Sequence, residues 1–240
     1  EEYRALLQRL QQTNMAIYRT AMGSDPNMAP LVALAAKFGL SDLDSNLLAD
    51  DDGLTSITVN PEGDHPRYIP YTDRPINWHS DGYYNSDERQ IRAMLLHCVQ
   101  NAAEGGGNLW QDNRMVYRQR RDENPDYIRA LMAEDVRTIP PGKDGEGEER
   151  GASVGPVFSI QKSGALHMRY TARKRNIEWQ DDAATQAALA ALGRAFAEAA
   201  TIQKVGRLST AEQVWHFFDR GEAVLPEFVT AADMMSTDVP

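Results

Sequence analysis

The stretch that decides the interpretation of this chain is Asn77-Trp78-His79-Ser80-Asp81-Gly82-Tyr83-Tyr84-Asn85. Its His-x-Asp pair lies in a segment expected to be extended, where residues two apart point to the same face. An imidazole nitrogen and a carboxylate oxygen placed in this way can bind one divalent ion. A distant histidine would then complete a facial triad of two histidines and one carboxylate. The alternative is a surface loop in which Asp81 caps a turn before Gly82.

Composition limits the class of protein. The 240 residues are 42% hydrophobic, which is enough for one domain with a sizeable core. The formal net charge of -10 repels phosphate backbones and argues against nucleic acid as a partner. Cys98 is the single cysteine, which excludes an intrachain disulfide and indicates a reducing compartment. With no apolar run of membrane-spanning length and an opening, EEYRALLQRLQQ, unlike a signal peptide, the sequence predicts a cytoplasmic protein without a membrane partner.

Hydrophobic spacing predicts a mixed order of elements. The spacing favours helices at 2–19, 29–38, 122–132 and 181–200, and strands at 57–59, 108–110, 157–160 and 166–171. The last two strands are expected to form a hairpin around Lys162-Ser163-Gly164. The apolar run 89–99 fits a helix or a buried strand, and 60–77 and 140–151 are expected to be loops. This order lacks the regular strand–helix alternation of a doubly wound sheet.

Three blocks, in order along the chain, carry a family resemblance. They are 68–85 around the His-x-Asp pair, 94–98 with 103–108, and 155–159 with 166–173. Together they resemble the taurine dioxygenase and γ-butyrobetaine hydroxylase-like family of Fe(II)- and 2-oxoglutarate-dependent oxygenases. The resemblance covers roughly 1–182 and weakens beyond. It implies a mainly β protein with flanking helices, folded as a double-stranded β-helix, a distorted jelly roll. We expect one oxygenase-like domain over 1–240, with a helical segment at 1–40 and a poorly matched part at 183–240.

The resemblance also implies a metal site. His79 and Asp81 match the first histidine and the aspartate of the family's iron triad. The family's distal histidine corresponds to His216, the only histidine after position 167. Its surroundings, Val214-Trp215-His216-Phe217-Phe218, differ from the family pattern. The alternative for His216 is therefore a half-buried place in an aromatic cluster.

Co-substrate residues follow from the same resemblance. Asn108 matches a polar position near the 2-oxoglutarate carboxylate, although a turn residue after Gly105-Gly106-Gly107 is an equal interpretation. Arg220 follows the distal histidine, and the 2-oxoglutarate arginine is sought among Arg169, Arg173 and Arg175. Guanidinium groups pair bidentately with carboxylates, whereas solvated arginines at a strand edge are the alternative.

The remaining candidates are aromatic residues and histidines. Trp78 and Tyr83 either line the substrate pocket or belong to the core. His97 is expected to be a satisfied core residue beside Cys98, His65 an exposed loop residue, and His167 a partly buried strand residue.

The function implied is an iron(II)- and 2-oxoglutarate-dependent dioxygenase that hydroxylates a small organic acid or zwitterion with dioxygen. A second hypothesis is an inactive relative that binds a ligand or a protein. A third is a cupin-like metal enzyme that does not use 2-oxoglutarate. A homo-oligomer remains open.

Overall fold

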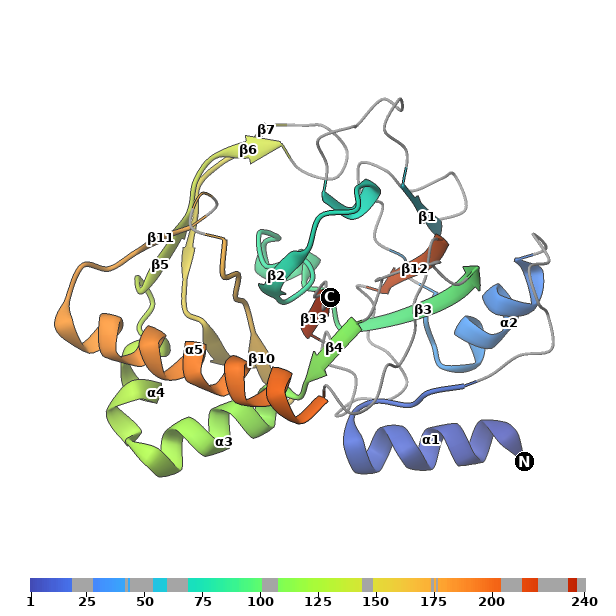
Figure 1. The fold of residues 1–240 in the computed structure, drawn as a ribbon, viewed down its shortest axis with the longest axis horizontal. Coiled ribbons are helices and arrows are strands. Elements are labelled where there is room, and N and C mark those ends of the chain that lie inside the picture. Colours follow the sequence, from blue (N-terminus) through green and yellow to red (C-terminus); the bar gives the residue numbers. More distant parts are fainter. Residues whose placement is uncertain are drawn as a thin grey trace.

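Figure 1 shows the arrangement of the chain in a computed structural model. The residues that the structure describes are 1–18, 28–41, 43, 54–59, 69–100, 108–143, 149–173, 175, 177–203, 213–219 and 233–236. Within these ranges, no helix is long and apolar enough to cross a membrane.

Five α-helices and thirteen strands are described. The helices are α1 (Glu2–Thr13), α2 (Ala29–Lys37), α3 (Asn113–Glu123), α4 (Pro125–Leu131) and α5 (Ala183–Gln203), with 3-10 turns at Ile69–Tyr71 and Asp87–Arg89. The strands are β1 (Leu54–Thr58), β2 (Ile76–His79), β3 (Ala93–Gln100), β4 (Asn108–Gln111), β5 (Arg137–Ile139), β6 (Gly142–Lys143), β7 (Glu149–Arg150), β8 (Ser153–Gly155), β9 (Phe158–Ile160), β10 (Leu166–Met168), β11 (Glu178–Trp179), β12 (Gln213–Asp219) and β13 (Asp233–Ser236).

The strands form small antiparallel sheets. Three sheets have three strands each, in the orders β1-β12-β3, β2-β13-β4 and β11-β5-β8. Hairpins β9–β10 and β6–β7 complete the described pairs. In Figure 1, β2, β13 and β4 lie in the middle of the molecule, between β1, β12 and β3 on one side and the helices α3–α5 on the other. The coarse expectation of a mainly β protein with helices around it is confirmed.

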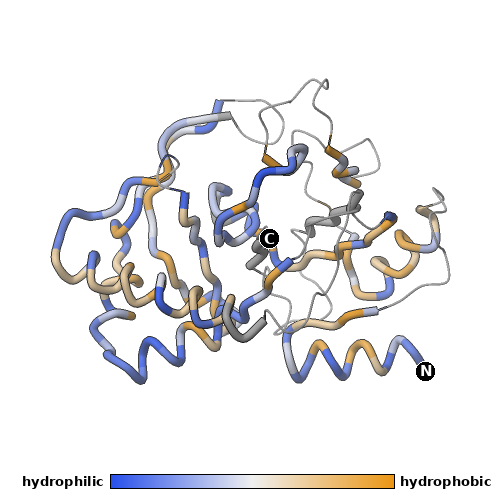
Figure 2. The backbone as a smooth tube through the Cα atoms, in the orientation of Figure 1, coloured by the Kyte–Doolittle hydropathy of each residue, from blue (hydrophilic) through white to orange (hydrophobic). Residues whose placement is uncertain are grey.

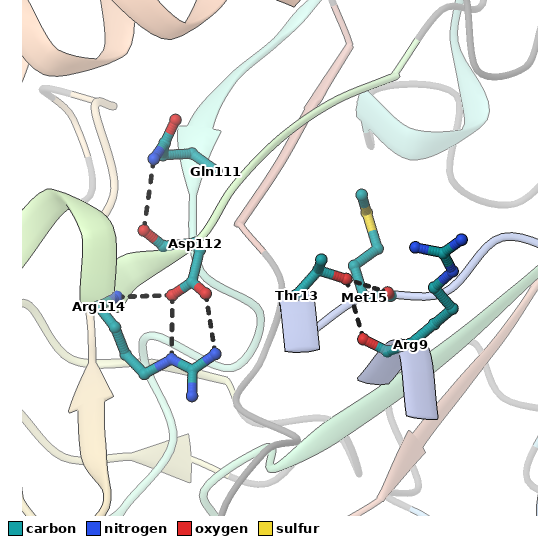
Figure 3. A network of polar contacts seen from close by, with 6 residues as sticks. All are labelled: Arg9, Thr13, Met15, Gln111, Asp112 and Arg114. Carbon is teal, nitrogen blue, oxygen red and sulfur yellow. Dashed lines mark hydrogen bonds and ion pairs between the residues drawn. The ribbon is translucent and has the colours of Figure 1, made fainter. Parts of the chain in front are cut away.

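Helices α3, α4 and α5 pack with strands β9 and β10 in what we call the helical layer (Figure 1). On α5, buried side chains recur at helical spacing, which aims one stripe of an alanine-rich helix at the core: Ala188, Ala191, Leu192, Ala195, Phe196 and Ala199. Leu131, Val116 and Phe158 are fully buried against that stripe. Asp112 caps α3 by accepting a hydrogen bond from the backbone N–H of Arg114 at 2.8 Å (Figure 3).

A second core lies at the opposite end of the molecule. Residues Leu31 and Ala35 of α2 pack with Leu54 of β1 and with Ala93 and Leu95 of β3. Hydrophobic and hydrophilic stretches alternate along the turns of α1 (Figure 2). Its partly buried Leu6 and Leu10 pack against this cluster.

His97 is buried in strand β3, where its Nδ1 lies 3.2 Å from the Tyr18 hydroxyl and its ring stacks on that tyrosine. It is therefore a satisfied core residue, as the sequence predicts. Burial raises the pKa of the Tyr18 hydroxyl and lowers the pKa of His97.

Several boundaries differ from the sequence-based expectation. Helix α1 ends at Thr13 because Asn14 adopts the left-handed conformation, and the Thr13 hydroxyl donates to the carbonyl of Arg9 at 3.0 Å (Figure 3). The helix expected at 122–132 is two helices: Asn124 is extended, ends α3, and caps α4 through the backbone N–H of Asp126. The undecided run 89–99 is strand β3. The predicted hairpin of β9 and β10 is confirmed, with Gly164 at a φ of 86° in its turn.

Candidate functional site

The imidazole of His79 is oriented by its own strand. At the end of β2, His79 Nδ1 lies 2.8 Å from the carbonyl oxygen of Asn77. A carbonyl only accepts hydrogen bonds, so Nδ1 carries the proton and Nε2 of the neutral ring keeps its lone pair. Histidines that bind metals are commonly fixed in this way, with the second nitrogen donating to a carbonyl. His79 therefore presents Nε2 as a potential ligand.

The carboxylate of Asp81 lies beside that nitrogen. His79 Nε2 and Asp81 Oδ1 are 3.7 Å apart, and the two side chains are only 18% and 11% exposed. Two neighbouring ligands about 2.1 Å from one octahedral ion lie about 3 Å apart, so a small movement of either side chain would bring both donors onto a shared cation. The pair is therefore neither divergent nor in bulk solvent.

One carboxylate oxygen of Asp81, Oδ2, is buried. This oxygen has no hydrogen-bond partner in the described part of the chain. Burial raises the pKa of this carboxyl to about 6, and the neighbouring His79 opposes that rise. A buried acceptor without a partner is costly unless something binds it. The proposed capping of a turn by Asp81 would have satisfied the carboxylate, and no such bond is found among these residues.

Neighbouring residues of β2 serve opposite faces. His79 pairs in an isolated bridge with Thr171, and Trp78 is buried with its ring 4.9 Å from that of Phe196 on α5. The same alternation runs along the partner segment, where Met168 and Tyr170 join the helical layer. His167, Arg169 and Thr171 therefore face the side of His79 and Asp81. We call these five residues the polar seam. Trp78 is thus a core residue.

Hydrogen bonds join the segment 169–172 to residues on both sides of Asp81. Ser80 and Tyr170 are joined twice: the backbone N–H of Ser80 donates to the Tyr170 carbonyl, and the N–H of Tyr170 donates to Ser80 Oγ, each at 2.9 Å. The backbone N–H of Ala172 donates to the Trp78 carbonyl at 2.8 Å. Arg169 donates from Nε to the Tyr83 carbonyl at 3.3 Å and from Nη2 to the Asn85 carbonyl.

Three arginines lie near His167, at the end of the polar seam away from His79. His167 is 3% exposed, more buried than the sequence indicates. Burial first, and then the nearby Arg169, Arg92 and Arg137, lower the pKa of His167 to about 3, so its ring is neutral at physiological pH. Arg137 is itself buried, and its Nε donates to the Pro156 carbonyl at 3.0 Å.

The remaining expected site residues differ in their sheet and in their exposure. Asn108 begins β4 and is half-buried; across β13 it is level with Ile76, so it belongs to the sheet that carries His79. Arg173 is half-buried two residues after Thr171, and Arg175 is exposed. His216 lies in β12, with its backbone opposite Thr55 and Leu96, in a different sheet from His79. Arg220, His65 and Gly105 to Gly107 lie outside the described residues.

Within the described ranges, no third histidine, cysteine or acidic residue joins His79 and Asp81 as a metal-binding group. Tyr83, by contrast, is placed in a small apolar cluster with Ile139 and Ile177. Sequence reasoning missed the contributions of Ser80 and Arg137, because a lone serine or arginine carries no spacing pattern. The period-two alternation of 167, 169 and 171 was the available signal.

Comparison with known proteins gives relatives for most of the chain. A family model described as "Taurine catabolism dioxygenase TauD, TfdA family" matches residues 2–204. A uridine-5'-phosphate dioxygenase from Streptomyces sp is 30% identical over 165 residues, which is 66% of this chain and 57% of that protein. A uridine-5'-phosphate dioxygenase from Amycolatopsis sp is 30% identical over 120 residues, 49% of this chain and 40% of that protein. The chain thus spans about half the length of the curated relatives it matches.

Solved structures share the fold at low sequence identity. An asparagine oxygenase in complex with Fe(II), 2S,3S-3-hydroxyasparagine and succinate superposes with a TM-score of 0.62 at 14% identity, covering 100% of this chain and 74% of that one. The non-heme iron oxygenase OrfP gives a TM-score of 0.59 at 12% identity, covering 100% of this chain and 76% of that one. The match of the family model over residues 2–204 places this chain in the TauD/TfdA dioxygenase family.

Proposed function

We propose that this chain carries the metal-binding part of an iron(II)- and 2-oxoglutarate-dependent dioxygenase, with His79 and Asp81 as two of the iron ligands. The observation that carries the proposal is the close pair itself. His79 Nε2 lies 3.7 Å from Asp81 Oδ1, and Asp81 Oδ2 is buried with no partner among the described residues. A hard or borderline divalent cation with imidazole and carboxylate ligands would satisfy both groups.

The third ligand is proposed to come from the C-terminal part of the chain, where His216 is the histidine that the sequence offers. For the co-substrate we propose Asn108, in the sheet of His79, together with Arg173 and Arg220. Arg169 is a weaker candidate than these arginines, since its Nε and Nη2 atoms already donate to carbonyl groups.

The fold supports this placement. We propose a single domain built on a double-stranded β-helix, with β2-β13-β4 and β1-β12-β3 as parts of its two sheets and the segment from α3 to α5 inserted between β4 and β12. Metal sites in such folds lie at an open end of the barrel, as expected for a pair at the end of β2.

In the reaction, bound iron would supply the activation of dioxygen, coupled to decarboxylation of 2-oxoglutarate. The chain's own residues would do the rest. The Asn77 carbonyl fixes the tautomer of the neutral His79 ring, so that Nε2 presents its lone pair to a metal. The low exposure of the Asp81 side chain, 11%, limits the access of water to its carboxylate, and the packing of Trp78 on Phe196 holds β2 against α5.

The substrate is proposed to be a small, charged metabolite. The two curated relatives are named for uridine-5'-phosphate, and the asparagine oxygenase structure contains a hydroxylated amino acid. These names set the order of a substrate panel: uridine 5'-phosphate first, then amino acids, then sulfonates. The chain's net charge of -10 and single cysteine support a cytoplasmic enzyme whose partner is a small molecule rather than nucleic acid.

The test combines metal binding with turnover. The purified chain is titrated with Fe(II) without oxygen, and then incubated with ascorbate, 2-oxoglutarate and the panel while succinate is measured. We expect one metal per chain and substrate-dependent succinate, with both lost in His79→Ala and retained in His97→Gln. No saturable metal binding would overturn the proposal. Metal binding without any response to 2-oxoglutarate would favour a cupin-like enzyme, and 2-oxoglutarate binding without turnover an inactive relative.

A further inference from the structure

We infer that Arg169 is a positioning residue that clamps the turn after the His-x-Asp pair and so holds Asp81 against His79. This inference rests on the proposed function, because its purpose is to pre-form a metal site. It assigns Arg169 a role different from the co-substrate arginine that its sequence position first indicates.

The contacts of Arg169 define the clamp. Its Nε donates to the Tyr83 carbonyl at 3.3 Å, and its Nη2 donates to the Asn85 carbonyl and to Ser153 Oγ, the latter at 2.9 Å. The side chain is 6% exposed, so these bonds are shielded from water. One guanidinium from the β9–β10 hairpin thus joins strand β8 to two carbonyls just beyond Asp81.

The turn that Arg169 holds is tight and leaves Asp81 little freedom. The backbone N–H of Asn85 donates to the Gly82 carbonyl at 2.8 Å, and Asn85 Nδ2 donates to the Arg89 carbonyl at 2.8 Å. Gly82 has a φ of +62°, and a Cβ there would lie 2.6 Å from Ile91 Cγ1. Because Asp81 directly precedes this turn, a shift of the turn changes where its carboxylate points.

The clamp complements the backbone pairing on the other side of Asp81. His79 is bridged to Thr171, and Ser80 is bonded twice to Tyr170. Arg169 is the next residue along the segment of Thr171 and Tyr170, and it binds the turn through its side chain instead of through backbone hydrogen bonds between strands. Residues 169–171 therefore hold the segment from His79 to Asn85 on both sides of Asp81, whose Oδ2 has no hydrogen-bond partner in the described structure.

The chemistry of the clamp requires arginine. A planar guanidinium presents several N–H groups in a fixed fork and can serve two carbonyls and a hydroxyl together. A lysine carries the same charge on a flexible stem, with a single ammonium that cannot reproduce the fork. Arg169→Lys therefore separates the fork from the charge.

The matched control is Arg120. It is also 6% exposed, and its Nη1 donates to a backbone carbonyl, that of Ala191, at 3.2 Å. It lies in α3 and pairs with Glu123 and Glu198, within the helical layer. Arg120→Lys disturbs a buried arginine of the same kind and leaves the turn after Asp81 untouched.

The first measurement is the dissociation constant for Mn(II), by calorimetry in the absence of 2-oxoglutarate. We expect Arg169→Lys to weaken binding about 10- to 100-fold, the range found when groups that orient metal ligands are lost, and Arg120→Lys to leave it unchanged. Arg169→Gln, which retains an N–H donor, replaces the lysine variant if that variant does not fold. Wild-type metal affinity in a folded Arg169 variant overturns the inference. If 2-oxoglutarate affinity falls while metal affinity stays constant, Arg169 is instead the co-substrate arginine.

The second measurement needs no metal. Amide hydrogen exchange of the metal-free chain reports the turn directly, and we expect Arg169→Lys to speed exchange at residues 80–85 while Arg120→Lys speeds it in α3 and α5. If the wild type binds no metal, the proposed function fails, and exchange still decides whether the clamp exists. Unchanged protection at 80–85 in the Arg169 variant overturns the clamp itself.

Discussion

Residues 166–171 separate two regions that are built on different physical principles. Met168 and Tyr170 join the apolar core cluster of the helical layer. Thr171, Arg169 and His167 belong to the polar seam, where one imidazole and one guanidinium are buried and the side chains of His79 and Asp81 are 18% and 11% exposed. Adjacent residues of β2 divide in the same way, with Trp78 in the layer and His79 in the seam. One extended segment thus serves stability with one set of side chains and the candidate site with the other.

The difference lies in what burial costs. In the helical layer each buried apolar side chain gains from leaving water, by about 25 cal/mol per Å² of apolar surface. In the seam, burial costs free energy unless a partner is supplied, and Asp81 Oδ2 has no partner within the described residues. Substitutions in the layer should therefore change stability, whereas substitutions in the seam should change ligand binding.

The largest expected effect is on metal binding in the seam. Asp81→Asn keeps the size of the side chain but removes its charge. Loss of a group that only orients a ligand weakens metal binding by up to about 100-fold, and we expect a larger loss here. The metal-free variant should be at least as stable as the wild type, because a neutral amide is less costly to bury than a carboxylate. Calorimetry with Mn(II) and urea unfolding measure the two effects. A variant that binds metal normally would remove Asp81 from the ligand set.

The largest effect on stability should come from the helical layer. Leu192 is fully buried on α5, and Leu192→Ala should lower the free energy of unfolding by about 2–5 kcal/mol through lost burial and the cavity left behind. Metal affinity of the folded variant should stay within a factor of two to three of wild type, by urea unfolding followed by metal titration. A large loss of metal affinity would show that the two regions are coupled.

Two glycines test whether the turn after Asp81 is tighter than an ordinary turn. Gly82 and Gly164 both have positive φ, but a Cβ on Gly82 would lie 2.6 Å from Ile91 Cγ1, whereas a Cβ on Gly164 would meet nothing within 4 Å. Gly164→Ala should cost about 1 kcal/mol from backbone conformation alone. Gly82→Ala should cost about 1–3 kcal/mol more, because of the close approach. Equal costs in urea unfolding would show that the turn has room to relax.

The last effect concerns the pH dependence of stability. The folded-state pKa of His167 is about 3, below its ordinary value of 6.5, so the unfolded chain takes up a proton first as pH falls. His167 therefore contributes stability above pH 6.5 that is lost progressively as pH falls toward 3. Between pH 7 and pH 5 the loss should be about 2 kcal/mol. His167→Gln should show a correspondingly weaker pH dependence of urea unfolding, and an identical dependence would mean that the ring is not held neutral.

Much of the fold could be predicted from local pattern. The helices at 29–38 and 181–200 and the hairpin around Gly164 follow from apolar spacing and turn residues, and they are confirmed. The boundary at Asn124 was missed although the sequence carries a signal for it, since Pro125 disfavours a helical conformation at the residue before it and asparagine is a common N-cap. The run 89–99 stayed undecided because a short apolar run fits either a helix or a strand; pairing with β12 makes it β3.

For the candidate site, the sequence by itself determined which two residues share a face: His79 and Asp81 are two apart in an extended segment, and alternation is a local property. Only the tertiary structure decided that the Asp81 carboxylate is buried beside His79 Nε2, and that Arg169 reaches back to the carbonyls of Tyr83 and Asn85. Residues 169–171 are far from this segment along the chain and become its neighbours only through pairing and packing. Burial and long-range hydrogen bonds depend on the whole fold, so no local pattern encodes them.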